Sequence, residues 1–123
     1  MNGKQKLEQA LAHKNGPVPF DLGATAVTGV HCSVVEALRE YYGLEKHPVT
    51  ISDPYQMLGL VENDLKEAMG VDTDCIASAT TMFGTAFGND KEWKTPWGQT
   101  VLVAKDFVTT TTLSGDTLVY PGG

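Results

Sequence analysis

The sequence predicts a single mixed α/β domain, and three observations support this fold class. The chain has 123 residues, of which 41% are hydrophobic and 20% charged, as in ordinary globular domains. Over residues 1–80, helix-spaced apolar residues alternate with short apolar runs. Residues 81–123 carry turn residues and β-branched runs instead. We therefore expect alternating helices and strands, followed by a β-hairpin or meander.

Four helices are predicted from capping pairs, in which a short polar side chain precedes a Glu or Gln by three residues. The pairs are Asn2 with Gln5, Ser33 with Glu36, Asp53 with Gln56, and Asp64 with Glu67. Stop signals follow three of these starts, at Asn15-Gly16-Pro17, at Gly43 and at Gly70. The helix after Ser33 is the clearest, because Val34, Leu38 and Tyr41 repeat at helical spacing.

Strands are predicted where short apolar or β-branched runs lie between turn residues. The runs are residues 18–22, 49–51, 71–77, 99–103, 107–113 and 117–120. Ser114-Gly115-Asp116 forms a tight connection between the last two. In contrast, residues 23–29 are small and contain two glycines, so we expect a loop there.

Charge and hydropathy exclude several classes of partner. The formal net charge is −6 and the sequence pI is about 4.8, so neither nucleic acid nor an anionic membrane surface is an expected partner. No apolar run approaches the roughly 18 residues of a membrane span, and the N-terminal residues lack the apolar stretch of a signal peptide. We expect a cytoplasmic protein, with Cys32 and Cys75 as reduced thiols.

The motifs that carry chemistry are weak. The loop at residues 23–29 has neither Walker A nor dinucleotide-binding spacing. His31 and Cys32 are adjacent and lack the spacing of a zinc site, and we expect no metal site. Asp72 and Asp74 fall on one face of a predicted strand, where two carboxylates could perform acid–base chemistry but more often cap or solvate a strand.

Aromatic side chains cluster near the start of the β-rich part. Trp93 and Trp97, with Phe83 and Phe87, could line a ligand pocket. Aromatic residues near a hairpin more often pack in the core, and we favour that interpretation. The residues by themselves identify no catalytic group.

Six short segments nevertheless form a recognisable series. They are Asp21-Leu22-Gly23 before Thr28-Gly29-Val30-His31, then residues 38–44 (LREYYGL), 53–58 (DPYQML), 67–72 (EAMGVD) and 115–121 (GDTLVYP). Together and in this order they resemble the uroporphyrinogen decarboxylase-like superfamily, in its divergent branch related to cobalamin- and corrinoid-dependent methyltransferases. The similarity spans nearly the whole chain.

This resemblance implies a (β/α)8 TIM-type barrel, of which 123 residues form only an N-terminal portion, since a barrel needs roughly 200 residues or more. We expect one truncated domain over residues 1–123, with a β-hairpin or meander at its end. Barrel active sites lie at the carboxyl ends of the strands. The ligand-facing candidates are Asp21, Thr25, Thr28, His31 and Ser78.

The resemblance also indicates which chemistry to expect. Decarboxylases of the superfamily carry arginines after the first strand, whereas residues 23–33 here contain none, and the family aspartate is absent from residues 77–80. The methyltransferase branch implies zinc, held by later His and Cys residues, and a corrinoid-protein partner. Neither cofactor is expected to be held by this chain.

Several functions therefore stay open at this point. The favoured hypothesis is an N-terminal segment of a methyltransferase-type barrel, inactive alone and prone to form a homo-oligomer or to pair with the remainder of a barrel. The alternatives are a non-catalytic module that binds a ligand or partner through residues 23–33, a fragment of a decarboxylase-type lyase, and a small enzyme that uses Asp72/Asp74 or His31/Cys32.

Overall fold

The computed structural model describes residues 1–81, 84, 86, 88 and 90–122, and this part of the chain is a mixed α/β fold. It contains three α-helices, one 3-10 turn and six strands. The elements are α1 (Gly3–Leu11), η1 (Ala26–Thr28), α2 (Cys32–Tyr41), β1 (Val49–Asp53), β2 (Leu58–Gly59), α3 (Asn63–Met69), β3 (Asp90–Lys94), β4 (Thr100–Ala104), β5 (Val108–Thr111) and β6 (Thr117–Tyr120).

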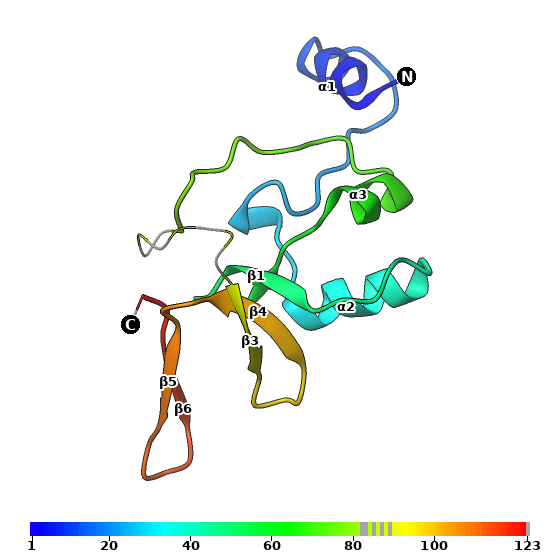
Figure 1. Cartoon of the computed structure of the whole chain (residues 1–123). Helices are drawn as coiled ribbons and strands as arrows, with labels where there is room; N and C mark the ends of the chain where they lie inside the picture. The colour runs from blue at the N-terminus through cyan, green and yellow to red at the C-terminus, as the bar shows by residue number, and fades with distance from the viewer. Residues whose placement is uncertain (82–83, 85, 87, 89, 123) are drawn as a thin grey trace.

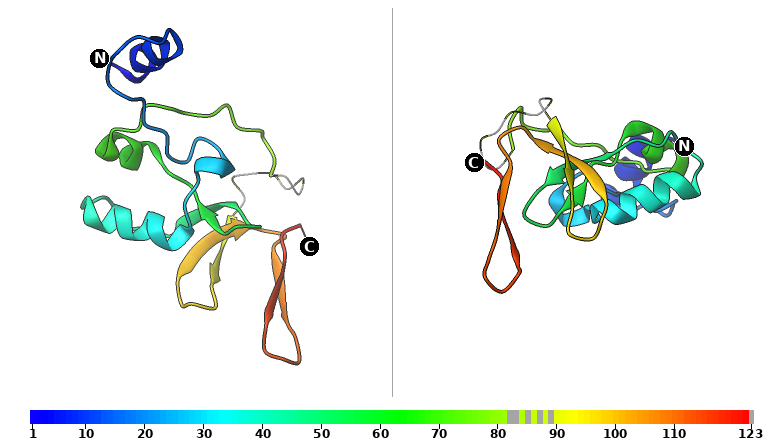
Figure 2. Two further views of the ribbon diagram at one scale, coloured as in Figure 1. Left: turned by 180° about the vertical axis from the view of Figure 1, so that it is seen from behind. Right: turned by 60° about the horizontal axis from the view of Figure 1, so that its bottom comes forward.

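Two separate sheets organise the strands (Figure 1). The larger has the order β2-β1-β4-β3, in which β1 and β4 are parallel and the other neighbours antiparallel. The smaller is the antiparallel pair β5-β6, which projects away from the larger sheet in both views of Figure 2. The described residues form no closed barrel.

The hydrophobic core lies where α2 and α3 meet the sheet. Its fully buried members include Val35 of α2, Val49 of β1, Leu65 of α3 and Val101 of β4, each no more than 1% exposed. The remaining members are Cys32, Ile51, Val61, Val103 and Phe107. Burial of these apolar side chains is the main source of stability, at about 1.5–3 kcal/mol for each fully buried side chain.

Helix α1 begins as the sequence predicts but ends earlier. The Asn2 side chain accepts from Gln5 N, and the Gln5 side chain accepts from Asn2 N, both at 3.0 Å, which completes the capping box. The helix ends at Leu11, before the predicted stop at residues 15–17, and His13 then adopts a positive φ of 54°. No side chain of α1 is buried, so the helix stands apart from the core (Figure 1).

The predicted helix after Asp53 is wrong, although its cap forms. The Asp53 carboxylate accepts from Tyr55 N at 2.8 Å and from Gln56 N at 3.3 Å. Met57 then takes a φ of 54°, which no helix accommodates, and the chain returns as β2 beside β1. The capping pair therefore makes a turn within a hairpin.

The other two helices form, but their starts differ from the prediction. His31, not Ser33, is the N-cap of α2, because its ring Nδ1 accepts from Ser33 N at 3.2 Å. Helix α3 begins at Asn63 with Glu62 as N-cap. Asp64 lies inside the helix, where its carboxylate accepts from Arg39 and from Leu65 N.

Four strand predictions are confirmed, and each of these strands has a partner strand that is close in sequence or buried. The segments at 49–51, 99–103, 107–113 and 117–120 overlap β1, β4, β5 and β6, and β1 and β4 extend beyond the predicted ends. Residues 18–22 and 71–77 are extended but belong to no sheet, so these two predicted strands are wrong. Strand β3 was not predicted, because four of its five residues are charged and only Trp93 is partly buried.

Candidate functional site

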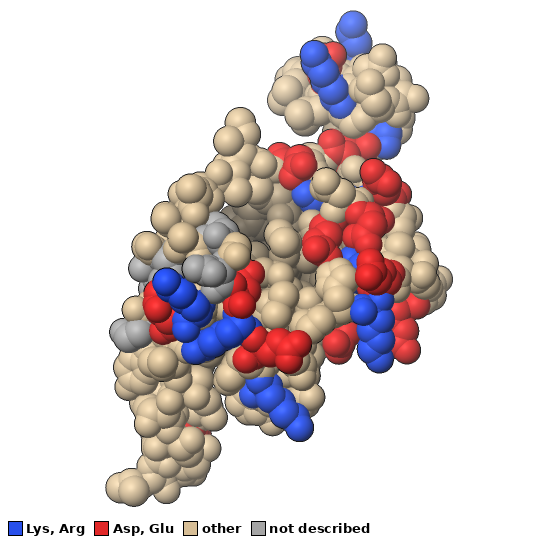
Figure 3. Space-filling model, in the orientation of Figure 1, with Lys and Arg blue, Asp and Glu red and all other residues tan. Residues whose placement is uncertain are grey.

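A cavity of about 590 Å³ lies between the small-residue loop at 23–29, the end of the β1–β2 hairpin and the extended segment 75–78. In Figure 3 a hollow is visible near the middle of the face shown. The described lining residues are Gly23, Ala24, Thr25, Ala26, Gly29, Thr50, Ser52, Asp53, Leu58, Gly59, Leu60, Cys75, Ala77, Ser78, Gly88 and Asp90. The lining is mostly apolar and is drawn from segments far apart in sequence, as is typical of ligand sites.

Glycines allow the loop to pack closely on the hairpin. Gly23 has a φ of +79°, and a Cβ built on it would lie 2.6 Å from Val61 Cγ2. A Cβ on Gly29 would lie 2.5 Å from Leu58 Cδ1. These two glycines therefore allow the loop to pack closely against the protein itself.

Backbone hydrogen bonds hold both ends of the same loop. Gly23 N donates to Thr28 O at 2.9 Å across the loop. Beyond the loop, Gly59 N donates to Val30 O at 3.0 Å, and Cys32 N donates to Met57 O at 2.9 Å. The loop is thus a preorganised wall of the cavity.

Asp21 fixes the chain just before the loop. Its carboxylate accepts from Thr73 Oγ1 at 2.5 Å. This hydrogen bond, more than the contacts with Thr28 and the Ala24 backbone, holds the pKa of Asp21 below its ordinary value. Thr28 Oγ1 is buried and makes no hydrogen bond of good geometry with the described residues, although it lies near enough to Asp21 to contribute to that pKa. Asp21 therefore anchors the chain just before the loop, and the buried Thr28 hydroxyl lies within the loop.

Asp72 and Asp74 serve as two separate anchors. Lys6 Nζ donates to both oxygens of Asp72 at 2.9 and 3.0 Å, and Phe20 N donates to Asp72 Oδ2 at 3.0 Å. Asp74 pairs with Lys66 at 2.6 Å. Each lysine hydrogen bond lowers the pKa of its aspartate. Both carboxylates are engaged by cations, and this arrangement does not favour an acid–base pair.

The two aspartates line a groove of about 510 Å³ with Lys6 and Lys66, between α1 and α3. A further hollow of about 340 Å³ lies against α1 alone. In the groove, Lys6 and Lys66 are already paired with the two aspartates, and the hollow borders one exposed helix. Neither therefore combines apolar walls with convergent polar groups.

His31 and Cys32 belong to a structural cluster at the start of α2. Cys32 Sγ lies 3.4 Å from Gln99 Oε1, and Gln99 Nε2 donates to Cys32 O at 3.0 Å. Trp97 Nε1 donates to the same Gln99 oxygen at 2.9 Å, and the Trp97 ring lies 5.1 Å from the His31 ring. Burial raises the pKa of the Cys32 thiol. A buried thiol with a raised pKa is a poor nucleophile and metal ligand.

Of the aromatic residues expected in the core, Trp93 packs there and Trp97 does not. The Trp93 ring lies 4.9 Å from the Phe107 ring, next to the core. Trp97 is 46% exposed. Neither tryptophan lines the cavity. Phe83 and Phe87 lie outside the described residues.

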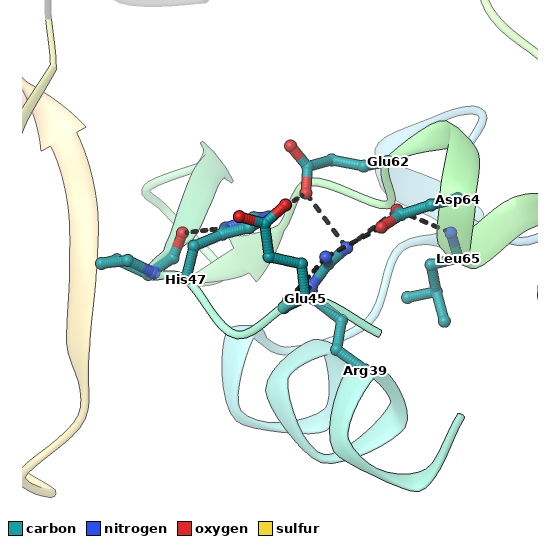
Figure 4. A network of polar contacts seen from close by, with 7 residues as sticks. Arg39, Glu45, His47, Glu62, Asp64 and Leu65 are labelled. Carbon is teal, nitrogen blue, oxygen red and sulfur yellow. Dashed lines mark hydrogen bonds and ion pairs between the residues drawn. The ribbon is translucent and has the colours of Figure 1, made fainter. Parts of the chain in front are cut away.

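Arg39 organises a polar network on the opposite side of the core (Figure 4). Its side chain, 5% exposed, donates to both oxygens of Asp64 at 2.8 Å and to Glu62 Oε2 at 3.1 Å. It also donates twice to Glu45 O, and His47 Nε2 lies 2.9 Å from Glu62 Oε2. The hydrogen bond to Arg39 lowers the pKa of Asp64. The network ties α2 to α3 and thereby fixes the hairpin between them.

The cavity brings together two of the five ligand-facing candidates, Thr25 and Ser78. The other three, Asp21, Thr28 and His31, lie among the supporting residues described above. Sequence reasoning missed Thr50, Ser52 and Cys75 as lining residues. An alternating pattern in β1 could have identified Thr50 and Ser52, because they fall on the opposite face from Val49 and Ile51.

The polar groups of the lining define what the cavity can bind. They are hydroxyls, one thiol and the carboxylates of Asp53 and Asp90, and the described lining contains no Lys, Arg or His. Such a surface disfavours a phosphate or carboxylate and accommodates an uncharged or cationic organic molecule. Among the described residues, no three His, Cys, Asp or Glu side chains are grouped so that they could hold a metal ion.

None of the helices in the described part of the chain is long and apolar enough to cross a membrane. Comparison with known proteins finds no matching family model, no matching curated protein and no matching solved structure.

Proposed function

We propose that this chain is the N-terminal segment of a uroporphyrinogen decarboxylase-like barrel of the corrinoid-dependent methyltransferase type, which supplies one wall of a small-molecule site and performs no catalysis alone. The observation that carries the proposal is the cavity of about 590 Å³, which the loop at 23–29 shares with segment 75–78. In the family resemblance, each of these two segments comes directly after a stretch that corresponds to a barrel strand. Ligands of such barrels bind beside the loops that follow the strands.

A contact between these two chain segments supports the barrel. Asp72 N donates to Phe20 O at 2.8 Å, and Thr73 donates to Asp21. Residues 18–22 and 71–77 therefore lie side by side, joined by one backbone hydrogen bond, although they form no ladder. Adjacent placement of these segments is what a barrel would require, and the remainder of a barrel would complete their pairing.

The chemistry of the cavity favours the methyltransferase branch over a porphyrinogen decarboxylase. A substrate with many carboxylates needs cationic partners, and the described lining offers only hydroxyls, a thiol and carboxylates. In this proposal, zinc and the corrinoid protein are bound by parts of the assembly outside this chain. The chain associates either with the remainder of a barrel or with a second copy.

The ligand class is tested with a matched pair of probes, benzyl alcohol and benzoate, monitored by two-dimensional NMR of the ¹⁵N-labelled chain. Benzyl alcohol is expected to shift amide signals of residues 23–29 and 75–78, and benzoate to leave them unchanged. The variant Thr25→Trp fills the cavity and should abolish the shifts, whereas Thr109→Trp on β5 should not. Equal binding of benzoate, or shifts confined to other residues, would contradict the proposed ligand class.

The absence of independent catalysis is tested separately. The purified chain is incubated with zinc, methylcob(III)alamin and a small thiol, and methyl transfer is measured. We expect the rate of the protein-free control. Turnover that disappears in His31→Ala or Asp72→Ala would instead establish a self-sufficient small enzyme.

A further inference from the structure

The strand edges of the two sheets differ in how they are protected from pairing with other chains. One edge of the larger sheet is β3, whose residues Asp90, Lys91, Glu92 and Lys94 are charged and exposed. Charged side chains on an edge strand are a common protection against unwanted pairing. Strands β5 (Val108–Thr111) and β6 (Thr117–Tyr120) contain no charged residue, and no described strand pairs with their outer edges.

The hairpin register shows which backbone groups of β6 are available. Thr112 N donates to Asp116 O at 2.9 Å, so this pair closes the ladder with a hydrogen bond. Because hydrogen-bonded and non-hydrogen-bonded pairs alternate in an antiparallel ladder, Thr110↔Leu118 is the next hydrogen-bonded pair. The backbone N–H and C=O groups of Thr117 and Val119 therefore point outward, one on each side of Leu118.

The side chains of the same ribbon divide into two faces. Val119 packs against the core, and its partner Thr109 lies on the same face. The opposite face carries Val108, Leu118 and Tyr120, which are 46%, 45% and 45% exposed. Figure 2 shows the ribbon projecting into solvent. Two strands alone are marginally stable in water, so a further strand would stabilise the ribbon.

We propose that the outer edge of β6 pairs antiparallel with β6 of a second copy of this chain, on a two-fold axis at Leu118. This register sets Thr117 of each copy opposite Val119 of the other, so that the outward backbone groups of both strands are satisfied. Leu118 meets its own symmetry mate as a close non-hydrogen-bonded pair and buries apolar surface.

Charge and composition favour this self-pairing. Asp116 falls opposite Tyr120 of the other copy, so no like charges meet across the axis. The β6 edge offers Leu118 at the axis, whereas self-pairing of β5 would place Thr110 there and bury less apolar surface. This inference depends on neither the family resemblance nor the ligand cavity.

The expected association is weak. Pairing of two four-residue strands buries far less surface than the roughly 1,600 Å² of a standard stable interface. Sedimentation of the whole chain, from about 20 µM to about 1 mM, should therefore show a monomer that converts progressively to a dimer. A chain that stays monomeric throughout this range would overturn the proposal.

Two matched lysine substitutions locate the interface. Leu118→Lys sets two positive charges face to face on the axis and should weaken the dimer at least about tenfold. Thr110→Lys places the same charge on the same face of the ribbon, one strand away, and should change dimerisation little. If Thr110→Lys disrupts the dimer and Leu118→Lys does not, β5 is the pairing edge and the proposal is wrong.

Disulfide trapping gives a readout that does not depend on the stability of the lysine variants. In a Cys75→Ser background, which removes the exposed native thiol, Leu118→Cys should form a disulfide-linked dimer under mild oxidation, because close strand pairs fall within disulfide distance. Thr110→Cys is the control and should cross-link poorly. Equal cross-linking of the two variants would contradict a two-fold axis at Leu118.

Discussion

The two walls of the cavity differ in how firmly the rest of the protein holds them. The loop at 23–29 is held by backbone hydrogen bonds at both ends and packs through glycines onto Val61 and Leu58. Segment 75–78 is exposed along its length, and its Ile76 side chain is fully in solvent. One wall is thus fixed by the protein's own packing, whereas the other makes few contacts with the rest of the described chain. A site with one fixed wall can keep its position while the other wall adapts to a ligand or to further chain.

The largest effect is expected from a side chain added to the fixed wall. Gly23→Ala introduces a Cβ at a φ of +79°, 2.6 Å from Val61 Cγ2, and should lower the free energy of unfolding by about 2–4 kcal/mol. Gly115→Ala is the control, because Gly115 also has a positive φ but has no atom within 4 Å of the added Cβ. It should cost only about 1 kcal/mol. Urea denaturation measures both, and equal costs would show that the loop is not packed as described.

The second largest effect is expected from the Arg39 network, which fixes the β1–β2 hairpin against which the loop at 23–29 packs. Arg39→Leu removes the paired hydrogen bonds to Asp64 and the two to Glu45 O. We expect a loss of about 1–2 kcal/mol, at the modest end for a buried arginine, because Asp64 is 44% exposed and stays hydrated without its partner. Arg39→Lys should recover little of the loss, since an ammonium group cannot make the paired contact. Full rescue by lysine would contradict this geometry.

A smaller effect is expected from acid. The pKa of Asp72 is lowered in the folded state from its ordinary value of 3.8, first by the Lys6 hydrogen bond. Its contribution to stability is therefore present above about pH 4 and is lost as the pH falls through the lower folded-state pKa. Asp72→Asn should flatten the decrease in urea midpoint between about pH 5 and pH 2. Asp106→Asn, at an exposed position, should leave the profile as it is in the parent chain.

The smallest effect is expected on the exposed wall. Ile76→Ser should change the free energy of unfolding by less than about 0.5 kcal/mol, because the side chain is already in solvent. Hydrogen exchange should likewise show weaker protection at residues 75–78 than at 23–29. A cost above about 1 kcal/mol would mean that Ile76 packs against something and that the two walls are alike.

Sequence reasoning succeeded where local chemistry decides the structure. The capping box of Asn2 and Gln5 and the hairpin around Ser114-Gly115-Asp116 form as predicted, because their interactions are made within a few residues. It failed at Asp53, where the cap forms but the positive φ of Met57 converts a helix start into a turn. It also missed β3, because a charged edge strand has no apolar signal and exists only through pairing with β4.

For the candidate site too, the sequence and the tertiary structure determine different features. The sequence by itself determined the mixed α/β class, the small-residue loop at 23–29 and the lack of cationic groups in it. Only the tertiary structure decided that Thr25 and Ser78 share a cavity, that His31 and Cys32 brace α2, and that Asp72 and Asp74 are anchors. The physical reason is that these roles depend on partners 50 or more residues away in several cases, and no local pattern records such partners.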